Sequence, residues 1–314
     1  MKTSFYSLFY LSFCLFFASV QELIASSIAD PYLTKEFTLS GKGELEVETS
    51  GASVAVMGLP GNQVIVEMYV KRNGREYGSK DPEIEELLEN YQLDISKSGN
   101  TISLKVKKKN NSGWNNRNNL NLSFKVQVPT EMSSYFQSSG GSISLENVSG
   151  EHKIATSGGS IRIADASGKV TSQSSGGSFS LTGFDGMVDV QTSGGSVKIN
   201  GLEGDLEINT SGGSVTLEDI SGSIDANTSG GSIRAKLLGV DEDLSFQTSG
   251  GSITAMVPAG LGLNLDLRGG RVNSRFSNFD GEVKKDLIVG KMNGGGPLLS
   301  MRSSGGSINL EFID

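Results

Sequence analysis

From residue 138 onward, hydrophobic and polar positions alternate in short runs, and the same pattern returns at a fixed interval. Ile143 and Leu145 belong to one such run, and Ile161 and Ile163 belong to the next. Alternation with a period of two is typical of β-strands that bury one face. Each interval holds two runs and one further apolar residue between them, which predicts about five inward-pointing side chains per repeat. Burying them offsets only part of the ordering entropy of one repeat, so neighbouring repeats must stack.

The interval is marked by the tetrapeptide Ser-Gly-Gly-Ser. Its first glycine is Gly140, Gly158, Gly176, Gly194, Gly212, Gly230, Gly250 and Gly305. The first six copies follow one another at a spacing of 18, the next spacing is 20, and the last gap of 55 corresponds to about three periods. Degenerate copies lie inside that gap, at residues 268–271, and far upstream, at residues 50–53. In most copies another glycine follows ten residues after the first. A fixed period of this kind indicates a repeat architecture.

Two architectures accommodate two strands per repeat, namely a parallel β-solenoid with one coil per repeat and an antiparallel meander with glycine hairpins. The polar positions favour the solenoid. One position is always a hydroxyl: Ser138, Thr156, Ser174, Thr192, Thr210, Thr228 and Thr248. The position before it is an amide in Gln173, Gln191, Asn209, Asn227 and Gln247. In-register parallel stacking would turn such columns into hydrogen-bonded ladders. The sequence therefore predicts an all-β, single-stranded parallel β-solenoid with 18-residue coils.

Residues 35–137 are less regular and are predicted to form N-terminal strands and a cap region, in one continuous domain with the repeat solenoid of residues 138–314. Strands are expected around residues 64–68, 102–106 and 122–128. Asp81 as N-cap and Pro82 in the first turn predict one short helix that reaches about Tyr91. Because an open solenoid end exposes unpaired strand edges, we expect this region to cover the end or to supply the first coils.

Residues 1–25 have the pattern of a secretory signal peptide. Lys2 is followed by an uncharged apolar segment at residues 5–18 and by small residues near Ala25. The only cysteine, Cys14, follows Phe13, where a lipoprotein signal would require a small residue. No later stretch is apolar and long enough to span a membrane. We therefore expect export to the periplasm, the cell surface or the extracellular space.

The amino-acid composition excludes several classes of function. Glycine accounts for 42 of the 314 residues and proline for only 6, so the glycines are expected in turns. The net charge of −8 argues against nucleic-acid binding, which needs a basic surface. The only histidine, His152, shares its position in the repeat with Val170, so we interpret it as a core residue. A catalytic triad or a histidine-rich metal site is then excluded, and we predict no catalytic residue, cofactor or metal.

Two rows of charged residues are candidate functional surfaces. Asp189, Glu207 and Asp225 form one outward column, and residues 241–243 lie in the repeat with two extra residues. These acidic residues are consistent with an alternative function, a polysaccharide-active enzyme that uses paired carboxylates. The repeats, however, lack the long loops that build a substrate cleft in such enzymes. On the other strand, Arg162, Lys198 and Arg234 recur every two coils and form a candidate surface for an anionic or hydroxyl-rich polymer. Trp114, in an asparagine-rich loop, is a further candidate, because its ring could stack on a sugar.

The chain resembles the bacterial putative-adhesin family of β-strand-repeat proteins from about residue 35 to residue 314. The resemblance is carried, in order, by residues 44–51, 124–129, 256–260 with 267–272, and 293–296 with 304–308. It implies a β-solenoid and an envelope location, with no catalytic residue. We therefore expect an exported, non-enzymatic scaffold that binds glycan or protein. The alternatives are a polysaccharide-active β-helix enzyme and a periplasmic, stress-related scaffold without an external ligand.

Overall fold

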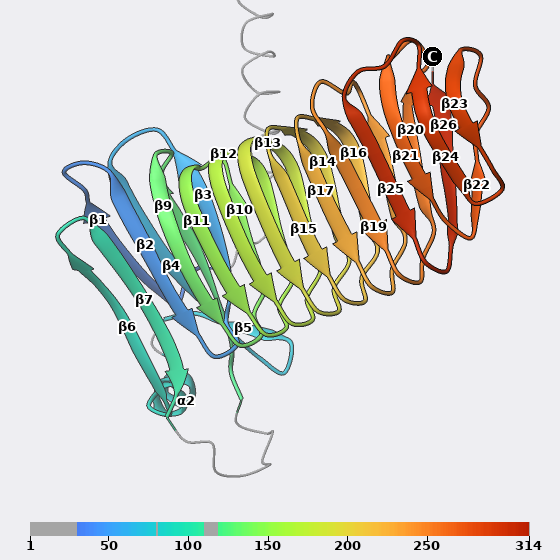
Figure 1. Cartoon of the computed structure of the whole chain (residues 1–314). Helices are drawn as coiled ribbons and strands as arrows, with labels where there is room; N and C mark the ends of the chain where they lie inside the picture. Colours follow the sequence, from blue (N-terminus) through green and yellow to red (C-terminus); the bar gives the residue numbers. More distant parts are fainter. Residues whose placement is uncertain (1–29, 80, 110–118, 314) are drawn as a thin grey trace, which may run out of the picture.

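The computed structural model describes residues 30–79, 81–109 and 119–313, which form one long stack of β-coils (Figure 1). The predicted signal peptide at residues 1–25 and Trp114 lie outside the described residues. In the repeats, equivalent strands of successive coils pair in parallel and in register: Ile161 pairs with Phe179, and Val170 pairs with Val188. The predicted parallel β-solenoid is therefore confirmed.

Each coil contributes one strand to each of two faces. The first-strand face consists, in spatial order, of β8 (Asn121–Pro129), β3 (Ser53–Leu59), β10 (Ile143–Glu146), the first parts of β12 (Ile161–Ser174) and β13 (Phe179–Thr192), β14 (Val197–Glu203), β16 (Val215–Ser221), β18 (Ile233–Leu237), β20 (Ile253–Pro258), β26 (Ser307–Ile313) and β22 (Arg271–Asn273). The second-strand face consists of β7 (Thr101–Lys108), β2 (Gly43–Thr49), β9 (Met132–Ser138), β11 (Ser149–Thr156), the second parts of β12 and β13, β15 (Leu206–Thr210), β17 (Ile224–Thr228), β19 (Leu244–Thr248), β25 (Leu298–Ser303) and β21 (Leu263–Arg268).

The core is a set of apolar columns that run along the solenoid axis. One column contains Ile199 and another contains Leu206, and both side chains are almost completely buried. Volume varies from coil to coil within a column. Phe246, buried at 1% exposure, pairs with the small Ala226 of the preceding coil. Such exchanges of large and small side chains keep the interior densely packed.

In the 18-residue coils, glycine is required at two positions because the coils stack so closely. A Cβ on Gly177, the second glycine of its motif, would lie 1.9 Å from the carbonyl oxygen of Gly159 in the preceding coil. At the opposite corner, Gly168 has a φ of +107°, and a Cβ there would lie 2.3 Å from the carbonyl oxygen of Gly150. These two corners account for the two glycine positions that recur in the sequence.

At the N-terminal end, spatial order differs from chain order. The coil made by β2 and β3 lies between the later coil β7–β8 and the coil β9–β10, and all neighbours pair in parallel. The degenerate motif at residues 50–53 is the corner of this coil, since a Cβ on Gly141 would lie 1.8 Å from the carbonyl oxygen of Ala52. Residues 43–59 and 101–129 therefore include true coils of the solenoid.

At the C-terminal end, too, the spatial order of the coils differs from their order in the chain. β25 pairs with β19 and β26 pairs with β20, so the motif that contains Gly305 stacks directly on the motif that contains Gly250. The coil that contains residues 268–271 lies outside this pair, as β21 and β22. The gap of 55 residues, although it corresponds to about three periods, therefore does not hold coils that stack in chain order. Parallel pairing requires only a free strand edge, and either segment can supply one whatever its position in the chain.

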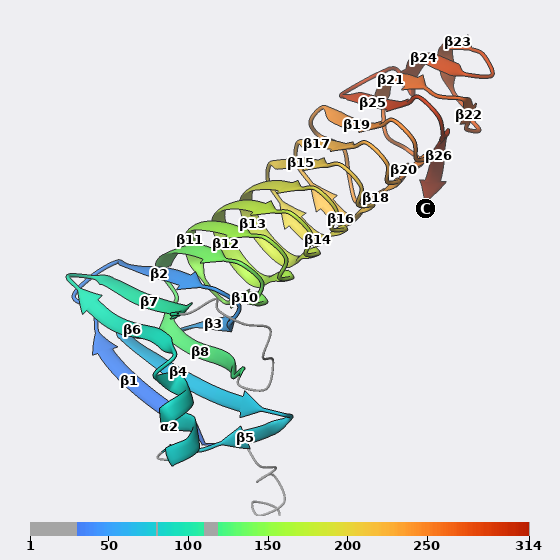
Figure 2. The ribbon, with the colours of Figure 1, turned by 90° about the horizontal axis from the view of Figure 1, so that it is seen from below.

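Antiparallel strands end the parallel stack on both sides. At the N-terminal end, β6 (Tyr91–Ser98) pairs with β7, β4 (Gln63–Arg72) pairs with β8, and β1 (Leu33–Thr38) and β5 (Arg75–Tyr77) pair with β4. At the other end, β24 (Leu287–Met292) pairs with β21 and β23 (Phe279–Val283) pairs with β24. Figure 2 shows these strands at the two ends of the stack. They cover the backbone edges of the last coils.

The predicted helix is α2 (Pro82–Leu88), and it packs at the N-terminal end (Figure 2). It ends before the predicted limit at Tyr91, because Tyr91 is the first residue of β6. The Asp81 carboxylate accepts hydrogen bonds from the backbone N–H groups of Glu83 and Ile84, at 3.1 and 3.2 Å. Ile84 and Leu87 bury the inner side of the helix. None of the helices in the described part of the chain has the length and apolarity that a membrane crossing needs.

Candidate functional site

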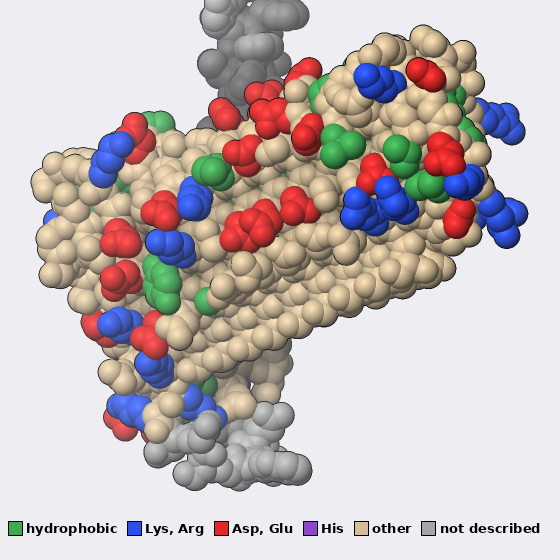
Figure 3. Space-filling model, in the orientation of Figure 1, with side chains coloured by type: hydrophobic (Ala, Val, Ile, Leu, Met, Phe, Trp, Pro, Cys, Tyr) green, Lys and Arg blue, Asp and Glu red, His purple; other side chains and the backbone are tan. Residues whose placement is uncertain are grey.

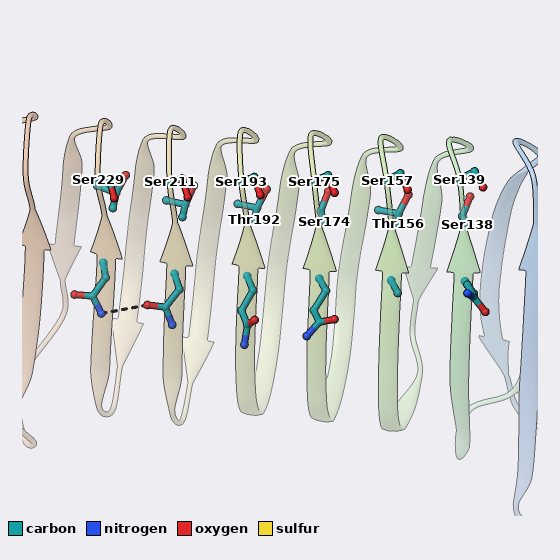
Figure 4. Close-up of a pocket in the computed structure, with 18 of the residues that line it drawn as sticks. Ser138, Ser139, Thr156, Ser157, Ser174, Ser175, Thr192, Ser193, Ser211 and Ser229 are labelled. Atoms are coloured by element: carbon teal, nitrogen blue, oxygen red, sulfur yellow. Dashed lines mark hydrogen bonds between the residues drawn. The ribbon is translucent and has the colours of Figure 1, made fainter.

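A long groove follows the Ser-Gly-Gly-Ser corner of the solenoid and has a volume of about 980 Å³. We name it the serine groove. Its lining residues are Glu48, Thr49, Ser50, Lys107, Gln137, Ser138, Ser139, Ala155, Thr156, Ser157, Gln173, Ser174, Ser175, Gln191, Thr192, Ser193, Asn209, Thr210, Ser211, Asn227, Thr228, Ser229, Gln247 and Ser249. Figure 4 shows the repeated rows of hydroxyl and amide side chains along successive coils. The side chains at this corner therefore form one continuous surface.

The inner row of hydroxyls is structural. Thr156 Oγ1 accepts a hydrogen bond from the Gly159 backbone N–H at 3.3 Å, and Thr192 Oγ1 accepts one from Gly195 in the same way. The equivalent bond recurs in the other coils from Ser174 to Ser303. Among the described residues of this row, only Thr49 and Ser138 hydrogen-bond to each other, at 3.2 Å. Thr228, Thr248 and Ser303 also donate to a backbone carbonyl of the neighbouring coil, at Gly213, Gly231 and Gly251. The predicted ladder of hydroxyl-to-hydroxyl bonds is thus wrong, because these hydroxyls bond to the backbone of their own turn or of the neighbouring coil.

The outer row of hydroxyls is available to a ligand. It consists of Ser139, Ser157, Ser175, Ser193, Ser211, Ser229 and Ser249, and all seven side chains are exposed. None of these hydroxyls hydrogen-bonds to another described residue of the chain. Each offers one donor and two acceptor positions. The groove therefore presents the same unused polar group once per coil.

The amides form a second row beside the serines. Gln173 and Gln191 make no hydrogen bond to other described side chains, whereas Asn227 donates to Asn209 across 3.5 Å (Figure 4). The predicted amide ladder is therefore limited to this one contact. Unpaired amides leave both donors and acceptors free, so this row adds directional hydrogen-bonding capacity to the groove.

Charge is almost absent from the groove lining. Among its described lining residues only Glu48 and Lys107 are charged, and they form an ion pair with each other at the N-terminal end. The middle coils therefore show an uncharged ridged surface in the space-filling view (Figure 3). Negative charge lies immediately beside it, because Asn209 donates to Glu207 and Asn227 donates to Asp225, each at 3.0 Å.

The acidic column borders a second groove on the outer second-strand face. Asp189, Glu207 and Asp225 pair in register, which confirms that they form one outward column. With Asp243 they line a groove of about 820 Å³ that also contains Lys169 and Arg302 at its ends. Asp243 accepts a hydrogen bond from the Leu298 backbone N–H at 2.7 Å, so this carboxylate also fixes the C-terminal coil. Within the ranges that the structure describes, no group of three or more His, Cys, Asp or Glu residues is placed to hold a metal.

The predicted basic row lies on the other face. Arg162, Lys198 and Arg234 are exposed on β12, β14 and β18, and the strand between each pair carries a neutral residue at this position, Ser180 or Thr216. Lys198 lies 3.9 Å from Glu218, and none of the three residues lines the serine groove. The structure thus places these three candidates in one row on the first-strand face, outside the lining of the serine groove.

His152 takes no part in either groove. The ring is 1% exposed, and Nδ1 lies 2.8 Å from the Ser134 hydroxyl in the preceding coil. Burial lowers the pKa of this histidine from 6.5 to about 4, so it is neutral at physiological pH. Its placement in the core confirms the interpretation from the repeat pattern.

The repeat pattern predicts the hydroxyl and amide columns but indicates coil stacking as the role of both. The serines that follow the hydroxyl column, such as Ser175 and Ser193, are not among the candidates predicted from the sequence, although they recur with the same period. Their alternation with the inward-facing Ser174 and Thr192 could have identified them, since adjacent positions on a strand face opposite sides.

Comparison with known proteins identifies the family. The chain is similar to a putative adhesin from Parabacteroides distasonis (12% identity, 90% of this chain and 96% of that chain, TM-score 0.41) and to one from Parabacteroides merdae (12%, 90% and 96%, 0.40). It is also similar to a putative lipid binding protein from Parabacteroides distasonis (13%, 90% and 97%, 0.38). No curated protein matches it. The Toastrack DUF4097 family matches residues 80–311. Because this match covers well over half of the chain, the protein belongs to the Toastrack DUF4097 family, which confirms the resemblance to a β-strand-repeat family seen in its sequence.

Proposed function

We propose that this protein is an exported, non-enzymatic scaffold that binds glycan along the axis of its solenoid. The observation that carries the proposal is the serine groove, in which seven coils present the same exposed hydroxyl without a partner in the described chain. A polymer of repeated sugar units offers hydroxyl groups at regular intervals. A periodic row of donors and acceptors is complementary to such a ligand.

Rigidity makes weak contacts effective. Each hydroxyl or amide contact contributes only about 0.5–1.5 kcal/mol net. The coils hold these groups in a fixed row, so the binding of one sugar unit places the next unit beside the next coil. Contacts made in this way act as an intramolecular array, and their combined affinity far exceeds that of one contact.

The geometry favours binding over catalysis. Both grooves are shallow faces of stacked strands, and the only histidine is enclosed in the core at 1% exposure. The basic row of Arg162, Lys198 and Arg234 remains a second proposed binding surface, for anionic partners. Export rests on the sequence pattern of residues 1–25.

Glycan binding is tested by presenting the chain from residue 26 onward to an array of glycans and by measuring the affinity for each glycan retained. Ser193→Tyr should block the serine groove and abolish retention. Ser196→Tyr is the matched control, because Ser196 belongs to the same corner and is exposed but does not line the groove. Equal retention by both variants, or no retention of any glycan by the unmodified chain, would contradict the proposal.

Location is tested separately by protease treatment of intact cells. Cleavage of the protein in intact cells would indicate a surface scaffold. Protection in intact cells, with cleavage after the outer membrane is opened, would indicate the periplasmic alternative.

A further inference from the structure

We infer that the ligand of the serine groove is an uncharged, ribbon-like glycan that lies parallel to the solenoid axis with about one sugar ring per coil. This inference rests on the proposed glycan binding and specifies the class of glycan. Three features of the groove carry it: its spacing, its lining and the charge beside it.

The spacing of the groove matches an extended polysaccharide. Neighbouring coils pair in register, so the seven outer serines follow one another at about 4.8 Å and span about 29 Å. One ring of an extended, β-linked hexopyranose chain advances by a comparable distance. A straight chain can therefore place each ring beside an equivalent serine, whereas a coiled polysaccharide leaves this line after a few rings.

The lining determines how the sugar is held. Among the described residues that line the groove there is no aromatic side chain, so ring stacking contributes nothing there. Outer hydroxyls such as Ser175 lie beside amides such as Gln173, and both have unused hydrogen-bonding groups. Two parallel polar rows suit the two hydroxyl-bearing edges of a flat sugar ribbon.

The charge beside the groove disfavours an acidic glycan. Glu207 and Asp225 each accept a hydrogen bond from an amide of the groove, so carboxylates border the row where the ligand lies. The cations that lie in or beside the groove are each paired with a carboxylate: Lys107 with Glu48, Lys153 with Glu151 and Arg302 with Asp266. The chain also carries a net charge of −8. A carboxylated polymer in the groove would thus meet repulsion at the coils of Glu207 and Asp225, whereas the lysines beside the groove are already neutralised by their own carboxylate partners.

The decisive probes are two soluble polymers with the same backbone, neutral hydroxyethylcellulose and acidic carboxymethylcellulose, together with cello-oligosaccharides from the disaccharide to the octasaccharide. We expect the chain to bind hydroxyethylcellulose at least tenfold more tightly than carboxymethylcellulose. Affinity for the oligosaccharides should rise with each added ring, because each ring reaches one more coil.

A matched pair of triple variants localises the binding. Ser157→Ala, Ser175→Ala and Ser193→Ala together remove three groove hydroxyls and should weaken hydroxyethylcellulose binding about tenfold or more, which corresponds to about 1.4 kcal/mol. Ser160→Ala, Ser178→Ala and Ser196→Ala remove the other serine of the same three corners and should leave affinity unchanged, since these residues do not line the groove. Thermal unfolding of both triples controls for stability.

The outcomes separate this inference from the proposed function. Tight binding of carboxymethylcellulose alone, or equal weakening by both triple variants, would overturn the inference while leaving glycan binding intact. Retention of glycans on the array without affinity for either cellulose derivative or any cello-oligosaccharide would overturn the inference in the same way. A chain that retains no glycan at all would overturn both.

Discussion

Gly306 packs against the backbone of Gly251, which lies several strands earlier in the chain, as closely as Gly177 packs against Gly159 of the preceding repeat. A Cβ on Gly306 would lie 1.9 Å from the carbonyl oxygen of Gly251, and a Cβ on Gly177 would lie 1.9 Å from that of Gly159. The corner geometry is therefore the same whether the neighbouring coil is consecutive in sequence or not. The second glycine of the motif is what permits this approach.

This relationship predicts opposite outcomes for two adjacent glycines. Gly177→Ala should lower the free energy of unfolding by about 1–3 kcal/mol, because the new methyl group overlaps backbone that cannot move independently. Gly176→Ala should change it by less than about 0.5 kcal/mol, because a Cβ there would meet nothing closer than 3.7 Å. Urea denaturation measures both. Equal destabilisation of the two variants would contradict the close backbone contact at the second glycine.

The strand register gives a second prediction. Leu206→Asp should destabilise the protein by several kcal/mol, because an unpaired carboxylate would be buried between Val188 and Ile224. Glu207→Ser, one residue further, should cost less than about 0.5 kcal/mol, since that side chain is exposed. If the two changes proved equally damaging, the inward and outward positions would have to be exchanged.

His152 predicts a dependence of stability on pH. The folded state holds its pKa at about 4, below the value of 6.5 for the exposed side chain. The unfolded chain then binds more protons between these values, so the free energy of unfolding should fall as the pH is lowered from 6.5 to 4. Protonation of His152 alone lowers the free energy of unfolding by about 3 kcal/mol at most.

Denaturation midpoints measured across this pH range test the effect. His152→Val, which introduces the side chain found at the same position of the next coil, should flatten the dependence. An unchanged slope in this variant would assign the acid sensitivity to other groups.

Much of the fold could be predicted because the repeat carries its own register. Once Ile161 and Phe179 occupy the same position of successive repeats, in-register parallel pairing follows. The ends could not be predicted in the same way. The coil of residues 43–59 and the coil of residues 298–313 are placed by free strand edges rather than by their position in the chain, and edge pairing leaves little trace in the sequence.

The candidate site was predicted only in part for a similar reason. The period showed that polar columns exist, but not which hydroxyls are consumed by the turn. Thr192 and Ser193 are adjacent hydroxyl residues, and only the structure shows that the first accepts a bond from Gly195 while the second remains free. The charged residues of the basic row were easier to select, because charge is visible in the sequence without knowledge of hydrogen bonding.

The basic row provides the last prediction. Replacing Arg162, Lys198 and Arg234 together by serine should leave thermal stability almost unaltered, because exposed charges contribute little to it. If this row binds anionic partners, the triple variant should lose affinity for carboxymethylcellulose more than any single change does, and added salt should weaken the binding of the unmodified chain in the same direction. Binding of hydroxyethylcellulose should be unaffected, since none of the three residues lines the serine groove. Affinity measurements with both polymers at low and high salt make the comparison. A loss of hydroxyethylcellulose binding in this variant would move the neutral-glycan site from the serine groove to the first-strand face.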